Sequence, residues 1–187
     1  MAKKRTSWIE NADTAFYAVA SLWAVYGVNA VIPVDLRQFG IRPRQLDGLW
    51  GVLFCPFLHA DLAHIMANSS ALFVLLALAL SFSRDLAATA VFFVVVLGGG
   101  GVWLLGDAHT TVIGASGVVF GLLGFLLAAG LFRREWRALL LSVVVFFFYG
   151  GILLSLLHNK PGVSWLGHAS GFVTGVLSAW WTRRFDR

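Results

Sequence analysis

The sequence contains six long runs of apolar residues separated by polar segments, and these runs restrict the fold more than any other feature. Each run is close to the roughly 20 residues that an α-helix needs to cross ~30 Å of hydrocarbon. Backbone polar groups in lipid must be satisfied within the segment, as a helix does, and the short alternating strands of a membrane barrel are absent. We therefore predict six membrane-spanning helices, at residues 14–32, 62–82, 86–105, 116–132, 138–156 and 162–181.

The predicted fold class is an all-α membrane protein, a bundle of six transmembrane helices in which residues 1–187 form a single domain. Composition agrees, because 59% of the residues are hydrophobic and only 12% are charged, too few to cover the surface of a soluble domain. The single cysteine, Cys55, excludes an internal disulfide and a cysteine metal cluster. We interpret the first run as a retained span, since no clear signal-peptide cleavage site follows it.

The basic residues predict the orientation. Six spans put both termini on one side, and ten of the 14 lysines and arginines fall on that side: Lys3, Lys4, Arg5, Arg84, Arg133, Arg134, Arg137, Arg183, Arg184 and Arg187. Arg37, Arg42, Arg44 and Lys160 fall on the other. By the positive-inside rule, both termini of this multi-pass protein of the cell (inner) membrane are cytoplasmic. The clustering fits a topology signal better than a nucleic-acid footprint, so we expect the lipid bilayer and no nucleic acid as a partner.

The second, fourth and sixth spans then begin on the outer side, and each carries polar residues near that end. His59, His64 and Asn68 lie at the start of the second span, and His64 and Asn68 share a helix face. The fourth span opens with Gly114-Ala115-Ser116-Gly117, and the sixth contains His168 and Gly171. Polar groups inside a membrane are costly, so one outward-facing pocket that collects them is a functional hypothesis.

Each of these residues also has a purely structural interpretation. Glycines around Ser116 and after His168 are typical of close helix packing in lipid. His59, His64 and Asn68 can satisfy the backbone of the long connection at residues 33–61, which we expect to lie in the outer interface and which could instead be partly disordered. His109 and His158 fall in outer connections and are expected to be solvated.

The joint pattern favours nucleophilic catalysis. A serine hydroxyl becomes a useful nucleophile when a base within hydrogen-bond reach takes its proton, and His168 can be that base for Ser116. The oxyanion that follows needs donors, for which the Ser116 amide and the side chains of His64 and Asn68 are candidates. No carboxylate lies at this depth, so the residues permit a Ser-His dyad and not a triad.

These motifs resemble those of the rhomboid intramembrane serine proteases, in order, spacing and sidedness. The resemblance implies that Ser116 is the nucleophile and His168 the general base, that His64, Asn68 and the Ser116 amide form the oxyanion site, and that His59 braces the loop, with Gly114, Gly117 and Gly171 completing the motifs. It implies transmembrane protein substrates cleaved in or near a membrane helix, without cofactor or metal. Many bacterial members carry a tyrosine where this chain has Phe120, so the phenol hydrogen bond is lost there.

Two alternatives remain open. The first is a non-catalytic rhomboid-like membrane protein that binds transmembrane clients, although such proteins usually lack the serine or the histidine. The second is a metal or haem site that uses His59, His64 and His168, although no carboxylate is evident in the spans to orient such ligands.

Overall fold

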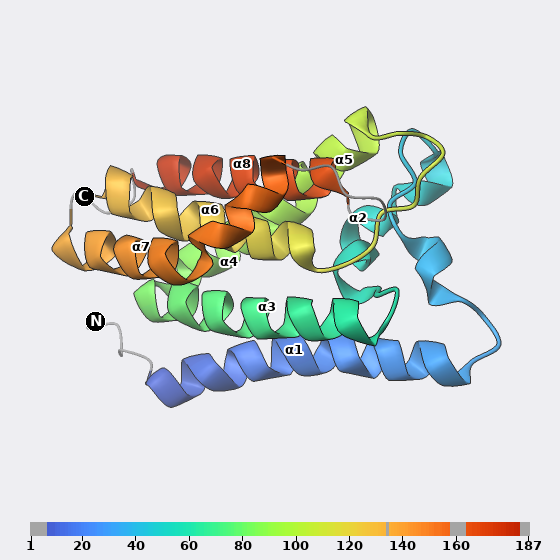
Figure 1. Ribbon diagram of the computed structural model, residues 1–187, viewed down its shortest axis with the longest axis horizontal. Coiled ribbons are helices and arrows are strands. Elements are labelled where there is room, and N and C mark those ends of the chain that lie inside the picture. The colour runs from blue at the N-terminus through green and yellow to red at the C-terminus, as the bar shows by residue number, and fades with distance from the viewer. Residues whose placement is uncertain (1–6, 134, 158–163, 184–187) are drawn as a thin grey trace.

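A computed structural model describes residues 7–133, 135–157 and 164–183, which fold into a bundle of helices (Figure 1). The helices that run along the bundle are α1 (Trp8–Val31), α3 (Leu62–Phe82), α4 (Arg84–Phe93), α5 (Gly99–Leu105), α6 (Ser116–Phe132), α7 (Trp136–Tyr149) and α8 (Trp165–Thr182). No β-strand occurs in these residues, where a single isolated bridge joins Ile41 and Val112. The all-α prediction is therefore confirmed for the described residues.

Four helical segments of the described chain are long and apolar enough to cross a membrane: Trp8–Val31, Leu62–Phe82, Arg84–Leu105 and Trp136–Leu156. Helix α6 is apolar but has only 17 residues, and the 18-residue α8 is not among the four. The count of six spans thus stays a prediction. Residues 162 and 163 of the expected sixth span lie outside the described residues. So do His158 and the basic residues Lys3, Lys4, Arg5, Arg134, Lys160, Arg184 and Arg187.

Helix α6 is the centre of the bundle. It is buried along most of its length, and it packs against α3, α4, α7 and α8. The contact with α8 is made by glycines, because a Cβ on Gly171 would overlap the Gly117 carbonyl and a Cβ on Gly175 would overlap that of Gly121. In lipid, where no hydrophobic effect drives two helices together, such close backbone approach supplies van der Waals contact.

Helices α4 and α5 belong to one continuous helical segment that contains a turn of π-helix, η4 (Val94–Gly98). Val94 of this turn packs on Gly121 of α6, and Gly98 faces Thr174 of α8, whose Oγ1 would lie 3.0 Å from an added Cβ. The segment therefore covers the seam between α6 and α8. The sequence predicted one span here and did not predict the π-turn.

The long connection between α1 and α3 is folded. It forms η1 (Leu36–Phe39), η2 (Leu46–Gly48), α2 (Gly51–Phe54) and η3 (Cys55–Phe57). The amides and carbonyls of Ile41 and Val112 exchange two hydrogen bonds, of 2.9 and 2.8 Å, and the Trp103 indole donates to the Gln45 carbonyl at 2.9 Å. These bonds fix the connection against the segment that leads into α6, so the alternative of a partly disordered loop is wrong.

Helix α1 begins six residues before the predicted start. Ser7 accepts a hydrogen bond from the Glu10 amide and Glu10 accepts one from the Ser7 amide, a capping box that extends the helix through a polar first turn. The apolar pattern alone could not reveal this turn.

Helices α3, α6 and α8 all begin at the same end of the bundle, opposite the starting end of α1 (Figure 1). The folded connection and the segment at residues 106–115 lie at this end too. The described basic residues Arg84, Arg133, Arg137 and Arg183 belong to helix ends at the opposite side, where α3 and α6 finish. The starting ends of α3, α6 and α8 therefore lie together at one end of the bundle.

We predict that Gly175→Ala destabilises the protein by about 1–3 kcal/mol, because the new methyl group would push α8 away from the Gly121 backbone. Thermal unfolding in detergent measures the effect. Gly27→Ala in α1 is the matched control, since no atom lies within 4 Å of a Cβ built there, and it should leave the melting temperature unchanged or raise it slightly. Equal melting temperatures for both variants would contradict the tight seam.

Candidate active site

Ser116 is the first residue of α6, and the chain reaches it through an unusual turn at Gly114. Gly114 has φ +112°, a conformation that other L-residues rarely adopt. A Cβ there would lie 2.7 Å from His64 Nε2 and 3.6 Å from Asn68 Nδ2. The side chains of His64 and Asn68 on α3 therefore lie directly against the peptide two residues before Ser116.

A hydrogen bond at the other ring nitrogen, Nδ1, orients the His64 ring. Nδ1 accepts a long, 3.5 Å hydrogen bond from the Ala60 amide, so the proton belongs on Nε2, which faces Gly114. Asp61 caps α3 by accepting the His64 amide at 2.8 Å. His64 thus satisfies one loop amide, as the structural interpretation expected, and still presents a donor to the start of α6.

Asn68 has no such structural partner. It is buried, and its Nδ2 makes no hydrogen bond within the described residues. A buried amide donor without a partner is expensive, and such groups are found where a ligand or water supplies the missing bond. Asn68 Nδ2 is therefore available to a group bound beside Gly114.

His168 lies at the same end of α6 and stacks on an aromatic ring of that helix. Its imidazole lies parallel to the Phe120 ring, with centroids 4.2 Å apart and an interplanar angle of 14°. Phe120 is one turn beyond Ser116 on the same helix face, and Gly117 lies against Gly167 and Gly171 of α8. His168 lies in the first turn of α8, nearer the helix end than the sequence suggested.

No hydrogen bond joins the Ser116 hydroxyl to the His168 ring in this structure. His168 is buried, and its Nδ1 has no partner among the described residues. The geometry therefore brings Ser116, His64, Asn68 and His168 to one region without closing the serine-histidine contact.

His59 packs against His64, one of these four residues. It is 2% exposed, its Nδ1 is 3.3 Å from the Phe57 carbonyl, and its ring meets the His64 ring edge to face at 5.1 Å. Burial lowers the pKa of His59 from 6.5 to about 4, and the nearby His64 adds to this. A neutral His59 packed on His64 is consistent with a bracing residue.

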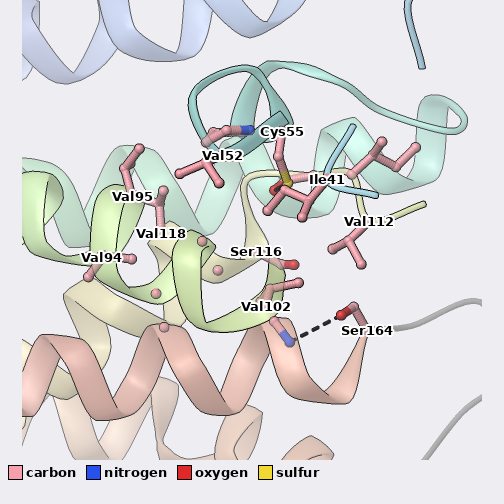
Figure 2. Close-up of a pocket in the computed structure, with 18 residues that line it drawn as sticks. Ile41, Val52, Cys55, Val94, Val95, Val102, Val112, Ser116, Val118 and Ser164 are labelled. Carbon is pink, nitrogen blue, oxygen red and sulfur yellow. Dashed lines mark hydrogen bonds between the residues drawn. The ribbon is translucent and has the colours of Figure 1, made fainter. Parts of the chain in front are cut away.

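A cavity of about 40 Å³ lies beside Ser116 and is large enough for water (Figure 2). Its walls are mostly apolar, from the connection, η4 and α5, and Ser164 lies across from Ser116 (Figure 2). Gly114 lines this cavity and also lies against the side chains of His64 and Asn68, which are not lining residues.

Cys55, the single cysteine of the sequence, holds the turn before Ser116. Its carbonyl accepts the Gly114 amide at 2.9 Å, and its thiol lies 3.6 Å from the Gly114 carbonyl as a donor. Burial raises the pKa of the thiol to about 12, so it keeps its proton. Its position in the fold, which no local pattern reveals, gives it this role.

His109 is exposed, as expected for a solvated residue. Among the residues that the structure describes, no three His, Cys, Asp or Glu side chains form a group that could hold a metal ion. The metal-centre hypothesis thus finds no ligand set in this part of the chain.

The chain is similar to one protein family and to several uncharacterized proteins. The family model of the Rhomboid domain matches residues 46–185. An uncharacterized protein of Mycobacterium tuberculosis is 43% identical over 187 residues, which cover 95% of this chain and 77% of the relative, and one of Mycobacterium bovis gives the same values. An uncharacterized protein of Mycobacterium leprae is 39% identical over 189 residues, covering 95% and 73%.

We predict that His59 makes the fold less stable in acid. The unfolded chain takes up a proton at His59 near pH 6.5 and the folded protein only near pH 4, so the unfolded state binds more protons between these values and stability falls as the pH is lowered through them. Thermal unfolding at several pH values should show a shallower loss for His59→Gln than for the parent. Parallel pH dependences would contradict a neutral, buried His59.

Proposed function

This chain belongs to the rhomboid family, and from that membership we propose that it is an intramembrane serine protease. Its substrates would be membrane-anchored proteins, cleaved at peptide bonds in or near their transmembrane segments. The observation that carries the proposal is the turn at Gly114, which sets Ser116 at the start of α6 with His64 and Asn68 against the preceding peptide.

Ser116 is the proposed nucleophile and His168 the proposed general base. His168 takes the hydroxyl proton as Ser116 Oγ attacks the scissile carbonyl, and then gives that proton to the leaving amine. The acyl-enzyme is hydrolysed by water that His168 deprotonates in turn. The described residues support this with a dyad, because the stacked Phe120 ring, and not a carboxylate, fixes the plane of the imidazole.

The negative charge that develops on the carbonyl oxygen needs donors already in place. His64 Nε2, Asn68 Nδ2 and the Ser116 amide are the proposed donors. The unpartnered Asn68 amide supports this, since a substrate oxyanion would supply its missing hydrogen bond. The His64 tautomer supports it as well, since its Nδ1 is engaged by the Ala60 amide.

The open Ser116–His168 contact is compatible with the proposal. Catalytic hydrogen bonds are often long in ligand-free enzymes and tighten when substrate binds. Phe120 already sets the plane of the imidazole, with ring centroids 4.2 Å apart and an interplanar angle of 14°.

Depth in the membrane supports hydrolysis at this site. Helix α6 has 17 residues, about 25 Å of helix, which is shorter than a full crossing of the hydrocarbon. Ser116 at its start would lie just below the outer surface, where water can enter. We propose accordingly a multi-pass protein of the cell membrane with cytoplasmic termini and an active site that opens to the outer side.

We predict that Ser116→Ala lowers the cleavage of single-span substrates by about 10³-fold or more, and abolishes labelling by a serine-directed fluorophosphonate, because the nucleophile is lost. Ser70→Ala is the matched control: its hydroxyl, on the exposed face of α3, donates only to the Ala67 carbonyl of its own helix. A parent protein that binds single-span clients yet neither cleaves nor labels would favour the non-catalytic alternative.

We further predict that Gly114→Ala lowers cleavage at least about 10-fold, because the positive φ strains alanine and the methyl group would crowd His64 Nε2. The variant should remain folded at the assay temperature, so that the loss of cleavage is not a loss of folded protein. Gly100→Ala in α5, which has open space for a Cβ, is the control and should retain activity. Full activity in a folded Gly114→Ala protein would contradict the proposed donor geometry.

A further inference from the structure

We propose that Ser164 is a positioning residue that fixes the first turn of α8 and thereby holds the His168 imidazole in register with Ser116. The inference rests on the proposed function, since it assigns Ser164 a part in the work of His168. No family motif in the sequence includes this serine.

Ser164 is the N-cap of α8 and satisfies two amides of its first turn. Its backbone is extended, with φ −75° and ψ 90°, and its Oγ accepts the Gly167 amide at 3.1 Å. Its carbonyl accepts the His168 amide at 3.1 Å. The residue that carries the proposed base is thus held by a hydrogen bond to the capping residue itself.

The first turn of α8 depends on this cap more than an ordinary helix start. Its third residue is Gly167, which lowers helix propensity relative to alanine and has no side chain to pack. The Ser164 hydroxyl lies close over Gly167, since it would be 3.0 Å from a Cβ added there. The cap therefore offsets the low helix propensity of this glycine.

The His168 side chain has few other restraints of its own. Phe120 covers one face of the ring, and Nδ1 has no partner among the described residues. The first turn of α8 therefore contributes to the position of the ring along α6, together with the Gly117–Gly171 backbone contact. Fraying of that turn would move the imidazole relative to Ser116 while the deeper Gly121–Gly175 seam stayed closed.

Ser164 also lines the cavity beside Ser116 (Figure 2). Its Oγ accepts the Gly167 amide, and the hydroxyl proton remains free to donate into that cavity. A direct contact with substrate is therefore the competing interpretation. The two differ in kinetics, because a lost substrate contact raises KM, whereas a displaced base lowers kcat.

The experiment compares Ser164→Ala, which removes the cap, with Ser164→Thr, which keeps a capping hydroxyl. Ser83→Ala is the matched control, because Ser83 caps α4 at the far end of the bundle by accepting the Leu86 amide at 3.4 Å. For each protein we would measure kcat and KM for a single-span substrate, the rate of fluorophosphonate labelling of Ser116, and amide hydrogen exchange over residues 164–170.

We expect Ser164→Ala to lower kcat and the labelling rate by about 3- to 30-fold, the range that loss of a helix cap implies, with KM within about 2-fold. Amide exchange over residues 164–170 should accelerate in this variant. Ser164→Thr should restore all three quantities, and Ser83→Ala should change none of them.

Three results would overturn the inference: an unchanged labelling rate in Ser164→Ala, a raised KM with unchanged kcat, or an equal loss of activity in Ser83→Ala. A parent protein that neither cleaves nor labels would overturn the proposed function instead. In that case the hydrogen exchange still decides whether Ser164 caps the turn, so the two failures are distinguishable.

Discussion

The glycine seam between α6 and α8 is the contact on which the rest of the structure depends. Gly117 and Gly171, and one turn deeper Gly121 and Gly175, let the two backbones approach so closely that a methyl group on α8 would overlap a carbonyl of α6. Ser116 and His168 lie at the open end of this seam. The same glycines that the sequence offered as a packing explanation are therefore what brings the candidate nucleophile and base together, so packing and chemistry are not rival interpretations here.

Around the seam, the site is built from main-chain hydrogen bonds more than from charges. The Cys55 carbonyl and thiol hold the two sides of the Gly114 peptide, Ile41 pairs with Val112, and Ser164 holds the amide of His168. Such bonds are short-range and are not screened by salt, and they suit a site at the edge of a low-dielectric medium, where an unpaired charge would be costly. The neutral His59, buried against His64, follows the same rule.

The sequence predicted those features that depend on residue type and period. The bounds of α3 and α6 were predicted at Leu62–Phe82 and Ser116–Phe132, because apolar runs end abruptly at Asp61, Ser83 and Arg133. It did not predict the polar first turn of α1, whose signal is a capping box rather than hydropathy. The π-turn η4 also went unpredicted; its Val94 packs on Gly121, a contact between residues distant in the sequence that hydropathy does not report. Likewise, the role of Cys55 depends on a partner 59 residues away, and a single sequence carries no trace of that pairing.

The turn at Gly114 has a consequence for how relatives are interpreted. Its positive φ and the His64 ring beside it require glycine for steric reasons that hold whether or not any peptide bond is ever cleaved. A relative without catalytic activity would still lose stability if this glycine were replaced, and we expect it to keep the glycine. The turn at Gly114 is therefore evidence for the shape of the site, and the hydroxyl of Ser116 is what its proposed chemistry depends on.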